Sequence, residues 1–134
     1  TKNMAPFFKN ETSNTNFIVG QEWHYETRTD EENSTLKILK IDEAEANIIH
    51  IAILGLKIKD IETGDLNEKI GHIPISEEVL SKSVTSLKNN QTELPDFQSG
   101  YSHWKASYDE GKAGFFTLSV KEIVQFIDEA INKK

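Results

Sequence analysis

The 134-residue sequence contains no cysteine, one methionine, three prolines and a single arginine, Arg28. Without cysteine, disulfide bonds, thiolate catalysis and cysteine-based zinc sites are excluded. The motifs GxSxG, HExxH, GxxxxGK[ST] and GxGxxG are also missing, so nothing marks a hydrolase, a zinc protease or a nucleotide site. No apolar run reaches the roughly 20 residues that a membrane-spanning helix needs. The sequence therefore predicts no cofactor, leaves enzymatic activity uncertain and favours a non-enzymatic role.

Acidic residues outnumber basic ones, 22 to 15, and the net charge is −7. This balance argues against nucleic-acid binding, which depends on clustered lysine and arginine. The acid is concentrated in residues 22–45, where eight acidic and three basic residues carry five of the seven net negative charges. Such a segment would steer a basic protein partner toward itself, although ordinary solvated turns have the same composition.

Residues 46–59 (ANIIHIAILGLKIK) form the longest apolar run and predict the central strand of a small sheet. Side chains alternate between the two faces of a strand. The face with Ile49, Ile51 and Ile53 is expected to be the core face. The opposite face would carry His50, Leu56 and Ile58.

Three further strands are predicted at residues 17–29, 34–41 and 68–75. In the first, Trp23 and Tyr25 alternate with charged residues, which predicts one buried and one wet face. The last strand is expected at a sheet edge, because Pro74 has no N–H to donate. It follows a hairpin with Thr63-Gly64-Asp65 at its tip. Residues 115–118 are a candidate fifth strand.

Three helices are predicted in the second half of the chain. Ser76 is an expected N-cap, and the apolar spacing carries this first helix through Val84 and Leu87 to residue 88. A second helix follows Pro95. Ser119 and Glu122 have the spacing of a capping box, which predicts the start of the last helix.

These elements predict an α+β fold, an antiparallel β-meander of four or five strands with two or three helices packed mainly on one face. Residues 1–16 are rich in asparagine and threonine, lack periodicity and are expected to form a flexible N-terminal tail. Residues 17–134 are expected to form a single domain, since this length suits one hydrophobic core.

Polar residues gather on the sheet face opposite the predicted core. Simple hairpin registers place Glu26, Lys37 and His50 in one row across three strands, with His24 and Arg28 beside Glu26. These five residues are a candidate ligand-binding site, in which the planar guanidinium of Arg28 would bind a carboxylate of the ligand through two parallel hydrogen bonds. Cross-strand charge pairs on a wet face would explain the same residues without a ligand.

No metal site is predicted on this face. His24 lies between Glu22 and Glu26, but side chains about 6.5–7 Å apart along a strand do not all reach one ion without a bulge. His50 and His72 share the face, yet the simple register separates them by roughly 20 Å. That distance is too large for a shared ion.

The predicted second helix carries an aromatic stripe at helical spacing, namely Phe97, Tyr101, Trp104 and Tyr108. Tyr101, Trp104 and Tyr108 are candidate partner-binding residues, because Tyr and Trp often dominate the energetics of interfaces. Packing into the core is the other explanation of this spacing. Glu31 and Glu32, from the acidic segment, complete the candidate partner surface.

Three stretches are familiar in combination: VGQEWHYETR with ENSTLKILKID, then GHIPISEEVLSKSVTSL, then LPDFQSGYSHWKASYDEGKAGFFTLSVKE. They resemble a family of small uncharacterised bacterial proteins over most of residues 18–132. The resemblance implies a bacterial source and a single domain. It brings no reaction, ligand or functional residue with it.

The leading hypothesis is a non-enzymatic protein-interaction module with an acidic contact surface, for example an inhibitor or immunity-type protein that faces a basic partner. The alternative is a small-molecule-binding protein that uses the polar sheet face or the aromatic helix. A hydrolase without a recognisable motif is the third hypothesis. The oligomeric state stays open, and so does the compartment: cytoplasm, or periplasm or exterior if a signal peptide has been removed.

Overall fold

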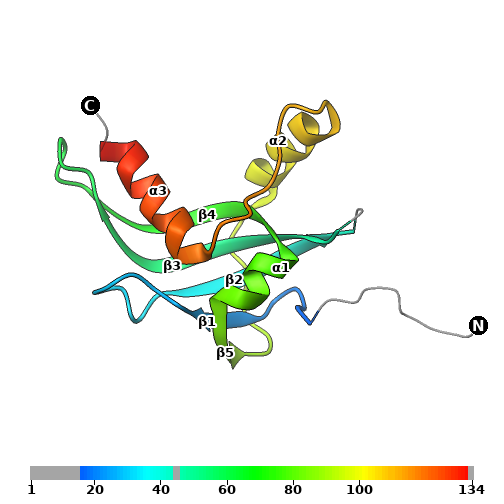
Figure 1. Ribbon diagram of the computed structural model, residues 1–134, viewed down its shortest axis with the longest axis horizontal. Helices are drawn as coiled ribbons and strands as arrows, with labels where there is room; N and C mark the ends of the chain where they lie inside the picture. The colour runs from blue at the N-terminus through cyan, green and yellow to red at the C-terminus, as the bar shows by residue number, and fades with distance from the viewer. Residues whose placement is uncertain (1–15, 44–45, 133–134) are drawn as a thin grey trace, which may run out of the picture.

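A computed structural model describes residues 16–43 and 46–132, with five strands in one antiparallel sheet in the order β4-β3-β2-β1-β5 (Figure 1). The strands are β1 (Glu22–Tyr25), β2 (Thr35–Asp42), β3 (Ile48–Lys59), β4 (Leu66–Ser76) and β5 (Val84–Asn89). The helices are α1 (Glu77–Ser83), α2 (Gln98–Asp109) and α3 (Val120–Asn132). The predicted α+β fold is confirmed. No helix of the described ranges is long and apolar enough to cross a membrane. Apart from Asn16, the predicted N-terminal tail lies outside the described residues.

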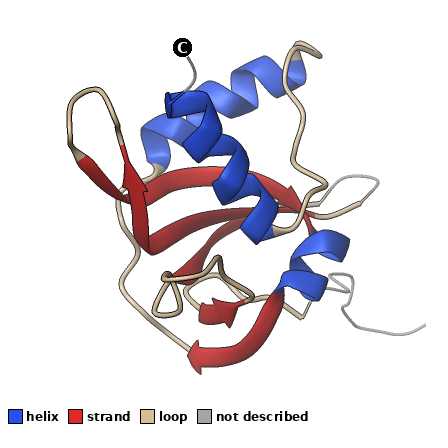
Figure 2. Cartoon of the chain, turned by 60° about the vertical axis from the view of Figure 1, so that its left-hand side comes forward, coloured by secondary structure: helices blue, strands red, loops and turns tan. Residues whose placement is uncertain are grey.

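The first four strands form a meander, and the fifth lies at the far edge of the sheet beside β1. α1 carries the chain from β4 to β5 (Figure 2). The prediction that the first helix continues to residue 88 is therefore wrong. Val84 already has extended backbone angles, φ −74° and ψ 150°, and the branched side chains of Val84 and Thr85 favour a strand. The candidate strand at residues 115–118 is reduced to a single bridge between Phe116 and Ile75.

One face of the sheet packs against α1 and α3 and forms the main core. Ile49, Ile51 and Ile53 are fully buried there, as predicted. Leu56 and Ile58 join the same core, contrary to the prediction. The alternation of side chains shifts at Gly55, whose φ of +73° lies in an irregular stretch of the β3–β4 ladder. A residue with a Cβ would be strained in this backbone conformation.

The opposite face of β3 and β4 is covered by α2. Its two buried side chains, Tyr101 and Trp104, pack with Ile48 in a second, smaller core. Core packing therefore accounts for most of the aromatic stripe of this helix. Two helices on one face and one on the other agree with the prediction that the helices lie mainly on one face.

The sequence signals at the helix starts are confirmed. The Ser76 hydroxyl accepts the N–H of Val79 at 3.2 Å. Ser119 and Glu122 form the expected capping box, in which each backbone N–H donates to the side chain of the other residue at 3.1 Å. Pro74 lies in β4, which is an edge strand of the sheet as predicted.

Candidate functional site

The strand register brings the polar sheet face and the aromatic helix to one place. Ile49 of β3 pairs with Ile75 of β4, whereas the simple register pairs Ile53 with Ile75. The true pairing is therefore displaced by four residues along β3. The displacement places His72 beside His50, so the predicted separation of the two histidines is wrong.

The turn after β3 gives the physical reason for this displacement. The backbone N–H of Asp60 donates to the carbonyl of Asp65 at 2.8 Å, and the Asp60 carboxylate accepts the N–H of Glu62 at 2.9 Å. A side chain that binds its own following backbone fixes the turn geometry locally. It centres the hairpin before Gly64, and the irregular steps of the ladder between Ile51 and Ile53 and between Leu54 and Ile58 complete the displacement.

Five residues from β2, β3, β4 and α2 form the histidine cluster: Asp42, His50, His72, Tyr101 and Trp104. Asp42 Oδ2 lies 2.9 Å from His50 Nε2, and His50 Nδ1 lies 2.8 Å from His72 Nε2. The Tyr101 hydroxyl donates to Asp42 Oδ2 at 2.9 Å. The result is a continuous hydrogen-bonded chain across three neighbouring strands and one helix.

The partners determine where the protons of this chain lie. The Asp42 carboxylate only accepts, so His50 Nε2 donates to it and, in the neutral imidazole, His50 Nδ1 accepts. His72 Nε2 must then be the donor to His50. His72 Nδ1 keeps a lone pair, and the chain therefore runs from a carboxylate to a base on a half-buried histidine.

Aromatic rings cover His50, which is fully buried. The rings of Tyr101 and Trp104 stand nearly perpendicular to its ring, with centroid distances of 4.9 and 4.7 Å. Trp104 also stacks with Tyr108 at 4.8 Å, and its indole N–H donates to the carbonyl of Gly114 at 2.7 Å. This packing keeps water away from the His50 ring.

Burial dominates the acid–base behaviour of the cluster. It lowers the pKa of His50, although the hydrogen bond and charge of Asp42 act in the opposite direction. Burial, followed by the charge of His50, lowers the pKa of His72 to about 4. Burial and the Asp42 carboxylate raise the pKa of Tyr101 to about 12. Near neutral pH both imidazoles are therefore uncharged, and the Tyr101 hydroxyl is a donor.

The predicted polar row across three strands does not form. Lys37 pairs with Glu22 on β1 and with Ala52 on β3, so neither Glu26 nor His50 lies opposite it. The β1–β2 register is displaced because residues 26–34 form a longer connection than the simple hairpin assumes.

Of the five predicted ligand-binding residues, only His50 belongs to the histidine cluster. His24 is half-buried opposite Thr35. Glu26 is exposed just beyond the end of β1, and Lys37 donates to the backbone carbonyl of Glu93 at 2.7 Å. These side chains do not converge on a common point with His50.

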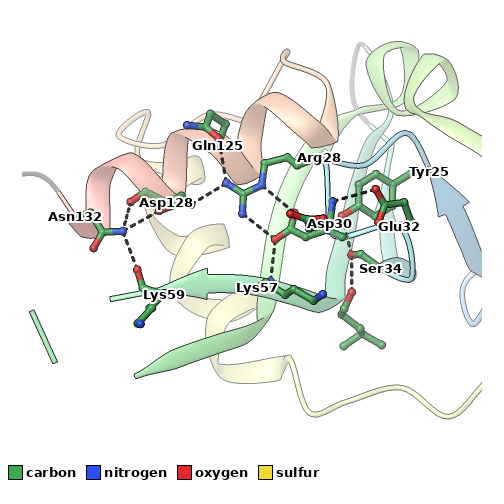
Figure 3. Close-up of polar contacts among 12 residues, drawn as sticks. Tyr25, Arg28, Asp30, Glu32, Ser34, Lys57, Lys59, Gln125, Asp128 and Asn132 are labelled. Atoms are coloured by element: carbon green, nitrogen blue, oxygen red, sulfur yellow. Dashed lines mark hydrogen bonds and ion pairs between the residues drawn. The ribbon is translucent and has the colours of Figure 1, made fainter. Parts of the chain in front are cut away.

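Arg28 binds carboxylates of the protein itself (Figure 3). Its Nε and Nη2 donate to the two oxygens of Glu31 at 2.8 and 2.7 Å, and its Nη1 donates to Asp128 at 2.8 Å. Glu31 is 2% exposed and also accepts the N–H of Lys57 at 2.8 Å. Arg28 thus ties the β1–β2 connection to α3 and β3, and its guanidinium is not free to receive a ligand.

The charges of this network stabilise each other. The hydrogen bonds to Glu31 and Asp128 raise the pKa of Arg28, against the effect of burial. Burial opposes ionisation of Glu31, but the bonds from Arg28 and from the Lys57 amide outweigh it and lower the pKa of Glu31. The network is therefore fully charged at neutral pH and has a structural role.

The structure also corrects the candidate partner surface. Tyr101 and Trp104 are 8% and 9% exposed, and Glu31 is buried. These three side chains lie inside the fold. Glu32 is exposed and Tyr108 is half-buried, so only these two candidates remain at the surface.

Sequence reasoning misses Asp42 and His72 as members of a site. They are 30 positions apart and belong to no local motif. Two histidines on the same face of neighbouring strands are the one available signal. That signal becomes informative only when the strand register is known.

A second feature lies at the connection between α2 and α3. Gly114, Phe115 and Phe116 line a surface hollow of about 300 Å³. The ring of Phe116 contacts that of Phe126 on α3, with 6.4 Å between centroids, and Phe126 is 54% exposed. We call Phe115, Phe116 and Phe126 the phenylalanine patch.

Comparisons with protein-family models, curated proteins and solved structures find no match for this chain. The resemblance to a bacterial family stays a prediction. Within residues 16–43 and 46–132, no group of three or more histidine, aspartate or glutamate side chains could hold a metal ion. The histidine cluster and the phenylalanine patch are therefore the two candidate sites of this protein.

Proposed function

We propose that the protein is a non-enzymatic interaction module that receives an apolar side chain of a partner protein at the phenylalanine patch. The observation that carries this proposal is the hollow beside Phe115 and Phe116, with the half-exposed ring of Phe126 in contact with Phe116. Single exposed apolar residues are ordinary. An apolar hollow beside an exposed aromatic ring is typical of a binding site, where a large side chain of the partner fills the pocket.

The charge of the protein supports a basic partner. The net charge is −7, and the acidic segment keeps exposed carboxylates although Glu22 and Glu31 are buried. The exposed acids of this segment, among the described residues, are Glu26, Asp30, Glu32 and Glu43. Long-range attraction would speed the encounter with a basic protein, and the apolar contact would hold it. An inhibitor or immunity-type protein is one role with these properties.

The test compares three immobilised baits in a pull-down from a bacterial lysate. The wild-type protein is compared with Phe126→Ser and with the matched control Leu66→Ser. Leu66 is 52% exposed, nearly the same as Phe126, but lies on β4. We expect a stoichiometric partner that the wild type and Leu66→Ser retain and that Phe126→Ser loses.

Salt and a direct contact map complete this test. Binding that weakens as salt rises would support the electrostatic part of the proposal. The captured protein is then titrated into isotope-labelled protein, and backbone shifts at residues 114–116 and 126 should be the largest. Equal capture by Phe126→Ser, or shifts confined to other residues, would overturn the proposal.

A second candidate, a binder of small zwitterions, is supported by a cavity of about 90 Å³ beside α2. Its lining combines the carboxylate of Asp42, the amine of Lys105 and the rings of Trp104 and Tyr108. Its size limits the ligand to a small polar molecule. A thermal-shift screen of free amino acids, repeated with Lys105→Ala, tests this candidate. No shift with any amino acid at millimolar concentration would exclude it.

A further inference from the structure

α2 is attached to the sheet chiefly through the histidine cluster. Tyr101 and Trp104 are its only buried side chains, and both contact the ring of His50. Gly100, one residue before Tyr101, lies against the side chain of His72. The buried side of α2 therefore rests on two histidines, and adding protons to them changes the charge that its side chains contact.

The hydrogen bonds of the pair can accommodate one added proton. A singly protonated pair can place both ring hydrogens on His50, which then donates to Asp42 and to His72, while His72 keeps one hydrogen on Nδ1. A second proton leaves His50 Nδ1 and His72 Nε2 both carrying hydrogen at a separation of 2.8 Å. Neither nitrogen can then accept, so the central hydrogen bond is lost.

The surroundings compensate one positive charge and not two. The charged or titratable groups around the pair are Lys40 and Asp42 on β2, Tyr101 and Asp109 on α2, and Glu43, Lys105 and Tyr108, which line the cavity beside Asp42 and Trp104. Among the described residues, Asp42 is the carboxylate hydrogen-bonded to the pair. The Lys105 amine and the Asp109 carboxylate neutralise each other at 2.7 Å. Lys40, 5.2 Å from the centre of the Tyr101 ring, adds a further positive charge.

We propose that α2 stays docked on the sheet while the His50–His72 pair carries at most one added proton, and that a second proton releases the helix. A doubly charged pair under aromatic rings lacks both hydration and a second carboxylate. Lifting the helix admits water to both imidazolium rings. Residues 90–97 and 110–115, which flank α2, belong to no helix or strand, so the helix can move without breaking the sheet.

Release of α2 would also change the phenylalanine patch, a consequence that rests on the proposed function. The indole of Trp104 holds the carbonyl of Gly114 at 2.7 Å, and Gly114 lines the hollow. Phe116 is held independently, because its backbone N–H donates to Pro74 and its carbonyl accepts from Ser76. Loss of the Trp104 bond therefore frees one wall of the hollow and leaves the other in place. Acid would then weaken partner binding.

The test follows the two indole N–H signals by NMR from about pH 7 to about pH 3, a range that extends below the pKa of about 4 that burial gives His72. No partner is present, so the result does not depend on the proposed function. The Trp104 indole reports on α2, whereas the Trp23 indole donates to Gln21 on the other side of the sheet and serves as an internal control. The Trp23→Phe variant assigns the two signals.

We expect the Trp104 indole to lose its protection from solvent exchange in acid, while the Trp23 indole and the Ile51 amide keep theirs. Where the docked pair carries one added proton and the released pair carries two, the ratio of the two forms should change by about tenfold per pH unit. His72→Gln preserves a donor to His50 but removes one titratable site, and should keep α2 docked. His103→Gln, at an exposed position of the same helix, should leave the transition unchanged.

Three outcomes would overturn the proposal. The Trp104 indole could stay protected while NMR shows that both His50 and His72 are protonated, which would mean that the docked fold accommodates the second charge. The Ile51 amide could lose protection together with Trp104, which would mean global unfolding. His72→Gln could also release α2 at the same pH as the wild type. If His72→Gln does not fold, the wild-type titration decides alone, because undiminished docking of a doubly protonated pair contradicts the proposal.

Discussion

His50 and His72 are 22 residues apart in the chain, yet their ring nitrogens lie 2.8 Å apart and their rings are nearly parallel, with an interplanar angle of 12°. Each ring depends on the other for a hydrogen-bond partner. His50 depends in addition on Asp42, which also receives the hydroxyl of Tyr101. Removing any member of this chain leaves a buried polar group without its partner, and such groups destabilise folded proteins.

Replacement of Asp42 by alanine should therefore lower the free energy of unfolding by about 2–4 kcal/mol, since two donors, on His50 and Tyr101, lose their acceptor. Urea unfolding followed by circular dichroism measures the change. Glu43→Ala, at the exposed neighbouring position, is the control and should stay within about 0.5 kcal/mol of the wild type. A loss below about 1 kcal/mol for Asp42→Ala would show that water replaces the carboxylate.

Replacement of Arg28 by alanine should destabilise the protein by about 3–5 kcal/mol, because Glu31 would be left charged and buried. The same urea titration detects the change. The control is Lys105→Ala, which breaks the exposed pair with Asp109 and should leave the free energy of unfolding close to that of the wild type. Equal small effects for both variants would contradict the structural role of Arg28 and reopen its interpretation as a ligand-binding residue.

Replacement of Ile51 by alanine tests the central strand. Ile51 is fully buried between the neighbouring strands and the covering helices, so we expect a loss of about 2–5 kcal/mol. Ile61→Ala removes the same atoms from a side chain that is 72% exposed and should change stability by less than about 0.5 kcal/mol. Similar losses for the two variants would be incompatible with the core described above.

Local signals in the sequence identify most of the elements. The apolar run with Ile49, Ile51 and Ile53 marks the buried central strand, and Ser76 and Ser119 mark the helix starts, because period and capping depend only on neighbouring residues. The signal fails where the spacing of apolar residues is compatible with both a helix and a strand. Val84 and Leu87 are three residues apart and fit a helix, but an open edge beside β1 makes the extended conformation of this segment more favourable.

The candidate site depends on register, which the sequence pattern does not determine. The position of His72 beside His50 follows from the turn that Asp60 organises and from irregular steps in the β3–β4 ladder. The polar side chains that lie together in the structure therefore differ from those that the simple hairpin registers place together. The lone arginine, Arg28, binds the nearby Glu31 but also Asp128, 100 residues away, and no local pattern contains this second pair.

Stability should fall as the pH is lowered from about 6.5 to about 5, because the histidine cluster disfavours added protons. The unfolded chain binds a proton at each histidine near the ordinary pKa of 6.5, whereas the folded state lowers the pKa of His50 and brings that of His72 to about 4. Below pH 6.5 the unfolded state thus holds more protons, and the free energy of unfolding decreases. The slope is at most about 1.4 kcal/mol per pH unit for each histidine.

Urea unfolding at several pH values measures this slope, and carboxylates do not obscure it. The lowered pKa values of Glu22 and Glu31 lie below their ordinary value of 4.5, so these groups contribute only in stronger acid. His72→Gln should reduce the slope between about pH 6.5 and about pH 5, since one of two perturbed groups is removed. His103→Gln should leave the slope as in the wild type. A wild-type stability that is flat over this interval would show that the buried pair takes up its protons as readily as the unfolded chain.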